Sequence, residues 1–241
     1  MIVNDYVLQA QDVAIHYDGV KAVDGVELSL VRGQIHGLIG PNGAGKTTLI
    51  NAITGRSVLT RGRVILRGED VSTLGVVERR RRGLSRSFQR TSIFAQMTVR
   101  RQVELASHRM GAKDSHADCA EVLRELSLDH LAEAMGANLG YGEQRRLDLA
   151  LALVGEPSVL LLDEPMAGLS VRESLDLADH LTALASQRDL SVLLVEHDMD
   201  VVFGISDIVT CFELGRVIAT GSPSEVRTDR YVREAYLGSA A

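Results

Sequence analysis

The 241-residue sequence contains no apolar stretch long enough to cross a membrane. Its longest apolar runs, such as Val159-Leu160-Leu161-Leu162, have only the length of a buried strand. The first six residues also lack a basic segment followed by a long apolar stretch, so no signal peptide is predicted. We therefore expect a cytosolic chain.

Cysteine is scarce as well, and acidic residues outnumber basic ones. Cys119 and Cys211 are far apart and lack metal or redox spacing, so we expect buried thiols rather than a disulfide. The net charge of −6 disfavours polyanionic partners, so a role with nucleic acid would need a local basic patch. The run Arg79 to Arg82 has no interleaved aromatic residues and ends a predicted helix over Thr73 to Arg82. We interpret it as a solvated helix end.

At 241 residues the chain fits one α/β domain with a small inserted subdomain. Its hydrophobic content of 45% is ordinary for a globular protein. Alternating apolar residues predict an antiparallel pair of strands over residues 7–17 and 26–30, with 63–66 in the same sheet. Further strands are predicted over 85–89, 158–163, 191–197, 208–213 and 217–219. A short helix is predicted to run to Leu237.

Between Met97 and Met135 the pattern changes to helical spacing, interrupted by the polar break Gly111 to Ser115. This predicts a small all-helical insertion. It contains three histidines without metal-ligand spacing, which we expect to be surface residues: His108, His116 and His130.

The residues Gly40 to Thr47 match the phosphate-loop pattern G-x-x-x-x-G-K-[ST] in full. An apolar strand, 35–39, precedes the motif, and a helix starting near Leu49 follows it. Glycines let the backbone N–H groups converge on an anion, and the helix directs its positive end to the same place. The predicted phosphate- and nucleotide-binding residues are Asn42, Gly43, Gly45, Lys46, Thr47 and Thr48.

Three more strand ends carry polar residues: Gln89, the pair Asp163-Glu164, and His197. The carboxyl ends of parallel strands meet at one edge of a sheet, so these residues are expected beside the phosphate loop. Together with Lys46 they supply the parts that nucleoside triphosphate hydrolysis needs.

The roles follow from chemistry. Thr47 and Asp163 are candidate ligands for Mg²⁺, with Gln89 near the metal or the attacking water. Glu164 is the candidate base for that water, and His197 a hydrogen-bond donor to the γ-phosphate. The predicted catalytic residues are Glu164, His197, Gln89 and Lys46.

These motifs make the chain resemble, over nearly its whole length, the ATP-binding subunits of ABC transporters. The resemblance assigns a Walker A loop at 40–48, a Q-loop at Gln89, a Walker B strand at 159–163, a D-loop at 167–170 and a switch histidine, His197. It places the family signature at Leu139 to Gln144, where Gly140, Gly142 and Glu143 are expected to face nucleotide. Tyr17 stands where the family has an adenine-stacking aromatic, although a residue packed at a strand edge is the alternative.

Several segments look like those of the branched-chain amino acid importer ATPases: 88–94, 142–147, 195–199 and 235–238. The ATPases of urea and short-chain amide importers share many of these sequence features. Two proteins of a different class could also carry these motifs: an ABC ATPase acting on ribosomes or DNA, and a non-hydrolysing ATP-binding regulator. The single cassette argues against the first, and the presence of Glu164 and His197 against the second.

The resemblance implies a P-loop NTPase (RecA-like) core with an N-terminal antiparallel β subdomain, formed by 1–94 and 155–241, and a helical subdomain over 95–154. It implies ATP and Mg²⁺ as cofactors. The implied partners are a second ABC ATPase subunit (a copy or a paralogue), two transmembrane permease subunits and, indirectly, a periplasmic binding protein, with no nucleic acid. The chain would lie at the cytoplasmic face of the inner membrane.

In this family each ATP lies between one subunit's Walker A loop and the other's signature. Coupling segments of the permeases dock near Gln89, where Ile93, Phe94 and Met97 either line the groove or pack in the core. Two positions depart from the family pattern: Gly140 replaces the signature serine, and Ser170 stands where the D-loop has Asp or Asn. We therefore expect the site that this chain completes for its partner to be weakened.

Overall fold

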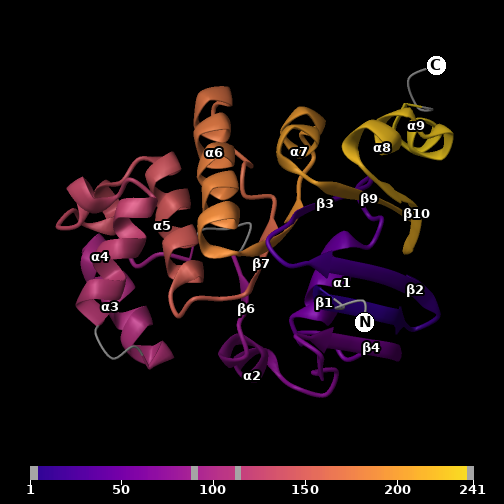
Figure 1. Cartoon of the computed structure of the whole chain (residues 1–241), viewed down its shortest axis with the longest axis horizontal. Coiled ribbons are helices and arrows are strands. Elements are labelled where there is room, and N and C mark those ends of the chain that lie inside the picture. The colour runs from indigo at the N-terminus through magenta and orange to yellow at the C-terminus, as the bar shows by residue number, and fades with distance from the viewer. Residues whose placement is uncertain (1–4, 88–91, 112–114, 238–241) are drawn as a thin grey trace.

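A computed structural model of the chain describes residues 5–87, 92–111 and 115–237 (Figure 1). Its strands are β1 (Tyr6–Tyr17), β2 (Val20–Val31), β3 (Ile35–Ile39), β4 (Arg61–Leu66), β5 (Glu69–Asp70), β6 (Leu84–Arg86), β7 (Val159–Asp163), β8 (Ser191–Val195), β9 (Ile208–Glu213) and β10 (Arg216–Gly221). A four-stranded antiparallel sheet has the order β2-β1-β4-β5. A six-stranded sheet has the order β10-β9-β3-β8-β7-β6, in which only the pairing of β9 with β10 is antiparallel. This arrangement confirms the expected α/β core with an antiparallel sheet beside it.

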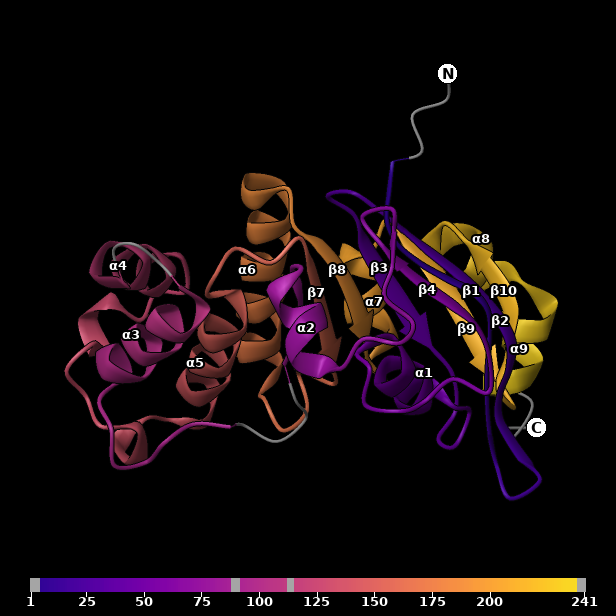
Figure 2. The same cartoon turned by 90° about the horizontal axis from the view of Figure 1, so that it is seen from below.

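The helices are α1 (Lys46–Ile53), α2 (Val76–Arg81), α3 (Val99–Met110), α4 (Ser115–Glu125), α5 (Tyr141–Leu153), α6 (Val171–Arg188), α7 (Met199–Ile205), α8 (Pro223–Thr228) and α9 (Arg230–Leu237), with short 3₁₀ turns at Asp129–Leu131 and Gly136–Asn138. Figures 1 and 2 show α3, α4 and α5 gathered at one end of the molecule and the antiparallel sheet towards the other. None of the helices in the described ranges is long and apolar enough to cross a bilayer.

The central strands β7 and β8 are buried on both faces, which explains their uninterrupted apolar sequences. Successive residues of β7 point to opposite sides of the sheet. Leu160 and Leu162 pack in a cluster with α3 to α6, whereas Val159 and Leu161 pack in a cluster with α1 and the antiparallel sheet. The helical insertion thus shares a core with the sheet, and the subdomain boundaries at 94/95 and 154/155 stay a prediction.

The helix predicted over Thr73 to Arg82 and the strand predicted over 85–89 were wrong in their limits, and that strand, β6, ends at Arg86. The helix predicted from Thr73 begins only at Val76, because Glu78 closes a capping box on the Gly75 backbone. The short helix predicted to run to Leu237 is confirmed as α9, whereas the separate helix α8 before it was not predicted. Asp229 lies between the two helices. Its carboxylate accepts hydrogen bonds from the backbone N–H groups of Tyr231 and Val232 and so caps α9.

The arginine run was also interpreted wrongly in part, because Arg79 is buried and Arg80 is half-buried, whereas Arg81 and Arg82 are exposed. Arg79 is 1% exposed and donates hydrogen bonds to the carbonyl oxygens of Ala52 and Ile53 at the end of α1. Arg80 donates to those of Ala152 and Val154 at the end of α5. The guanidinium groups thus satisfy helix-terminal carbonyls that have no partner within their helices.

Candidate active site

The phosphate-loop segment Gly40 to Thr48 connects β3 to α1, as the sequence predicts. Gly45, which precedes α1, has a φ of +105°, and a Cβ there would lie 2.3 Å from the carbonyl oxygen of Ala22. Only glycine fits this position. The loop borders a cavity of about 470 Å³ that is lined, among others, by Asn42, Gly43, Gly45, Lys46, Thr47, Thr48 and Glu164. The predicted loop residues therefore share one cavity with the predicted base.

Lys46 places a buried positive charge in this cavity, which the more exposed Lys21 also lines. Its Nζ donates hydrogen bonds to the carbonyl oxygens of Gly40 (2.6 Å) and Pro41 (3.1 Å). Burial lowers the pKa of Lys46, and the nearby carboxylates of Glu164 and Asp163 oppose that shift. The ammonium thus lies at the loop, with two acidic groups supporting its charge.

Asp163 ends β7 and is 6% exposed. Its Oδ2 accepts a hydrogen bond of 2.8 Å from Nη2 of Arg86, which ends β6. The other terminal nitrogen of Arg86, Nη1, donates to Oδ1 of Asn51 in α1 at 2.6 Å. The sequence reasoning missed Arg86, although it lies three residues before the predicted Q-loop residue.

Glu164 follows Asp163 in the left-handed backbone region, with a φ of +52° that is unusual for a residue other than glycine. Its Oε1 lies 2.7 Å from Nε2 of His197. The structure therefore brings the predicted base and the predicted switch histidine into direct contact from the ends of β7 and β8. Such backbone strain is often found where a catalytic side chain must be aimed.

A second buried acid, Glu196, ties the segments that carry these two residues together. Its Oε1 accepts from the backbone N–H of Met166 at 2.6 Å, and its Oε2 accepts from that of His197 at 3.1 Å. Glu196 is 4% exposed, and burial raises the pKa of its carboxyl group. The sequence reasoning did not single out Glu196, because its contacts appear only in the fold.

The signature residues lie elsewhere. Gly140, Gly142 and Glu143 line a separate surface pocket that shares no lining residue with the phosphate-loop cavity. Gly140 precedes α5, and its backbone N–H donates to Oε2 of Glu143 at 2.7 Å. Within one chain, therefore, the signature does not close over the phosphate loop.

The D-loop contacts the signature helix of the same chain. The hydroxyl of Tyr141 donates to the carbonyl oxygen of Ala167 at 3.0 Å. Ser170 is the N-cap of α6 and forms a reciprocal capping box with Glu173. The serine at this D-loop position thus has a structural role that Asp or Asn would also fill.

Gln89 lies outside the described residues, but both flanks of its segment are held by one side chain. Asp148 of α5 accepts a hydrogen bond from the Ser87 hydroxyl (2.5 Å) and from the Ser92 backbone N–H (3.1 Å). Because α5 begins at the signature, the Q-loop segment and the signature helix are joined through Asp148.

Tyr17 and the proposed docking residues have mixed surroundings. Tyr17 is 51% exposed, and its hydroxyl lies 3.3 Å from that of Ser57. Tyr17 is not among the described residues that line the phosphate-loop cavity. Its role in stacking stays a prediction.

Phe94 is 59% exposed, whereas Ile93 is partly buried against the core. Core packing, one of the two alternatives, thus holds for Ile93, and the docking role of Phe94 stays a prediction.

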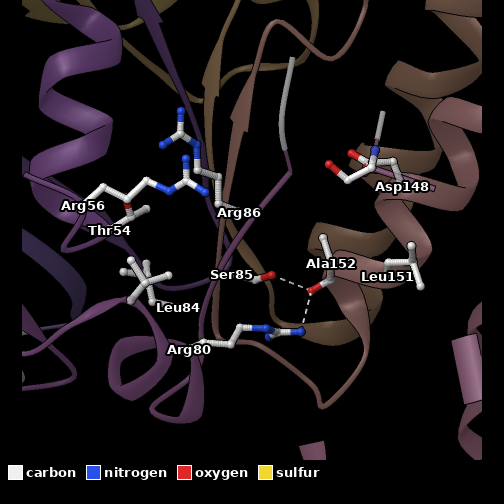
Figure 3. A pocket seen from close by; sticks show the side chains of 11 residues that line it. Thr54, Arg56, Arg80, Leu84, Ser85, Arg86, Asp148, Leu151 and Ala152 are labelled. Carbon is white, nitrogen blue, oxygen red and sulfur yellow. Dashed lines mark hydrogen bonds between the residues drawn. The ribbon is translucent and has the colours of Figure 1, made fainter. Parts of the chain in front are cut away.

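A second cavity, of about 270 Å³, lies between α2, β6 and α5 (Figure 3). Arg56, Arg80 and Arg86 line it together with the apolar side chains of Val76, Leu84 and Leu151. Asp148 supplies the carboxylate on its α5 side. The cavity therefore reaches Ser92, which flanks the Q-loop segment.

The donor chemistry fits Mg²⁺. Asp163 and Thr47 offer oxygen atoms, which hard cations prefer. No cluster of three or more His, Cys, Asp or Glu side chains suited to a metal occurs among the described residues. A Mg²⁺ ion held by few protein oxygens and by nucleotide phosphates needs no such cluster. His116 instead pairs with Glu104 at 2.9 Å, and both cysteines are buried thiols.

The phosphate loop, the strand-end carboxylates and the parallel sheet define a P-loop nucleoside triphosphatase. Residues 23–167 match the family model described as ABC transporter, and residues 216–241 match one described as branched-chain amino acid ATP-binding cassette transporter. The chain belongs to the ABC transporter family, as an ATP-binding protein with ATPase activity.

Individual relatives support this assignment. The chain is 35% identical to the high-affinity branched-chain amino acid transport ATP-binding protein BraF of Pseudomonas aeruginosa, over 97% of this chain and 98% of BraF. It is 33% identical to the lipopolysaccharide export system ATP-binding protein LptB of Haemophilus influenzae, over 96% and 97%. A crystal structure of the ADP conformation of an ABC transporter cassette superposes with a TM-score of 0.86 at 27% identity, over 97% of this chain and 99% of that one. The fold-class and family predictions are confirmed.

Proposed function

We propose that this chain hydrolyses ATP to drive solute import, and that the solute is a branched-chain amino acid. The contact between Glu164 and His197, beside the cavity of Lys46, carries the catalytic part of the proposal. The similarity to BraF and the match of residues 216–241 support the solute. Importers of urea or short-chain amides are the alternative.

In this mechanism the phosphate loop and Lys46 bind the nucleotide phosphates. Thr47, Asp163 and Gln89 would hold Mg²⁺, which would neutralise phosphate charge when bound. Glu164 accepts a proton from the attacking water. His197 orients Glu164 and hydrogen-bonds the γ-phosphate, and Glu196 fixes the backbone of both segments. Tyr17 would stack on adenine.

The separation of the signature pocket from the phosphate-loop cavity supports a two-subunit site. Gly140, Gly142 and Glu143 would cover the nucleotide of a second ATPase subunit, whether a copy or a paralogue. Two transmembrane permease subunits would hold the pair at the cytoplasmic face of the inner membrane, and a periplasmic binding protein would supply the solute. The cavity of Figure 3, which Ser92 lines, is the candidate docking site for a permease segment, and Phe94, exposed two residues further along the chain, is a candidate contact.

Uptake of radiolabelled leucine, isoleucine and valine tests the proposal in cells that lack this gene. Wild-type chain should restore uptake, and the Glu164→Gln variant, expressed to the same level, should not. Restored uptake of urea or acetamide without that of the amino acids would select the alternative solute. If cells that lack this gene take up the amino acids, urea and acetamide as fast as cells that have it, a role in import is contradicted.

A further inference from the structure

Arg86 binds the carboxylate that the proposed function assigns to the metal site. The side chains of Arg86 and Asp163 are 9% and 8% exposed, and Nη2 lies 2.8 Å from Oδ2. Because Nη1 also donates to Asn51, one guanidinium joins α1, β6 and β7. This is a buried ion pair with a fixed geometry, unlike the exposed pairs on the surface of the chain.

Whether the ion pair between Arg86 and Asp163 is stable depends on whether another cation binds Asp163. Removing the cation that pairs with a buried carboxylate is strongly destabilising, so we expect Asp163 to keep a paired cation in every state. Arg86 also shares a cavity with a second guanidinium, that of Arg56. A divalent cation bound to Asp163 would replace Arg86 as the positive partner of that carboxylate.

We propose that Arg86 is an exchangeable counter-ion, which holds Asp163 in the absence of metal and gives it up when Mg²⁺ and nucleotide bind. This inference rests on the proposed function, because it takes Asp163 to be part of the Mg²⁺ site. Arg86 also lines the cavity of Figure 3, which offers the displaced side chain a place to go. Metal binding would then change the charge distribution in the candidate docking site.

Thermal unfolding of the purified chain tests the proposal with EDTA, with ADP and EDTA, and with ADP and Mg²⁺. Without metal, Arg86→Gln should lower the melting temperature by roughly 6–12 °C, since Asp163 loses its counter-ion. With ADP and Mg²⁺ most of that deficit should disappear. The Mg²⁺-dependent part of the shift should therefore be larger in the variant than in wild type, by about 4 °C or more.

Arg80→Gln is the matched control. Arg80 is a half-buried arginine of the same cavity, but it donates to the carbonyl oxygens of Ala152 and Val154 rather than to a carboxylate. Its loss should lower the melting temperature equally in all three conditions. If Arg86→Gln does not fold, Asn51→Ala replaces it. Asn51→Ala removes the amide that fixes Arg86 and should give a smaller difference of the same sign.

The outcomes separate the two levels of the proposal. If Mg²⁺ shifts the melting temperature equally in wild type and in the Arg86 or Asn51 variant, Arg86 is not an exchangeable counter-ion. The proposed ATPase function would not be affected by that result. A wild-type chain that ADP does not stabilise, with or without Mg²⁺, would instead contradict the proposed function itself.

Discussion

Nε2 of His197 lies 2.7 Å from Oε1 of Glu164, although 33 positions separate the two residues. Glu164 takes its backbone direction from a left-handed φ of +52° and from a hydrogen bond of its N–H to the carbonyl oxygen of Val195. The two side chains are thus held together by the ends of adjacent parallel strands, which makes each a determinant of the other's orientation.

The first prediction concerns His197. His197→Ala should lower the ATPase rate by about 10–100-fold, because Glu164 loses its orienting partner and the γ-phosphate loses a donor. The dissociation constant for ADP should change little, since Lys46 and the phosphate loop are untouched. His180→Ala is the matched control and should keep the rate, because His180 is a half-buried histidine on α6 whose Nδ1 lies 2.6 Å from the Asp176 carbonyl oxygen. Equal rates in the two variants would exclude a catalytic role for His197.

The second prediction concerns Glu196. An amide at this position accepts through only one oxygen, so Glu196→Gln cannot satisfy both the Met166 and His197 N–H groups. We expect the turnover number to fall about tenfold at an unchanged KM for ATP. A fall in thermal stability with an unaltered turnover number would show that Glu196 supports only the fold.

The third prediction concerns His36, which is 2% exposed in β3 and lies 2.8 Å from the Thr210 hydroxyl through Nε2. Burial lowers its pKa from 6.5 to about 4. The unfolded chain therefore binds a proton first as the pH falls. The stability contribution of His36 is full above pH 6.5 and is lost between pH 6.5 and 4, by up to about 3 kcal/mol.

Urea unfolding at pH 7.5 and pH 4.5 measures this effect. His36→Gln keeps a hydrogen-bonding side chain without a titrating group, so it should lose less stability than wild type over the same range. A pH dependence shared by the two proteins would assign the acid sensitivity to other groups.

The fourth prediction concerns the signature. Gly140 has an extended backbone, with φ −64° and ψ 162°, and a Cβ there would make only ordinary contact, 3.5 Å from Glu143 Oε2. Gly140→Ser therefore fits and also adds a helix cap. In the assembled transporter it should raise the ATPase rate by restoring a hydroxyl donor to the partner's γ-phosphate. Gly140→Ala, which fits equally well without a hydroxyl, should not, and an unchanged rate in the serine variant would refute the weakened site.

Much of this account follows from the sequence, because its signals are local. A few neighbouring residues are enough to predict the phosphate loop and the strand of Val159 to Asp163. The roles of Arg79, Arg86 and Glu196 do not, since each depends on a partner brought close only by folding. Arg86 and Asp163 are 77 positions apart, and Arg79 contacts carbonyls 26 and 27 positions away. A charged residue beside a motif gives no sign of which buried group it will meet.

The most direct test of the central claim is phosphate release by the assembled transporter, comparing wild type with Glu164→Gln at saturating ATP and Mg²⁺. If Glu164 is the base for the attacking water, the variant should bind ATP as wild type does and hydrolyse it at least about 100-fold more slowly. Equal rates of phosphate release in the two proteins would contradict the assignment and, with it, the mechanism built on the contact between Glu164 and His197.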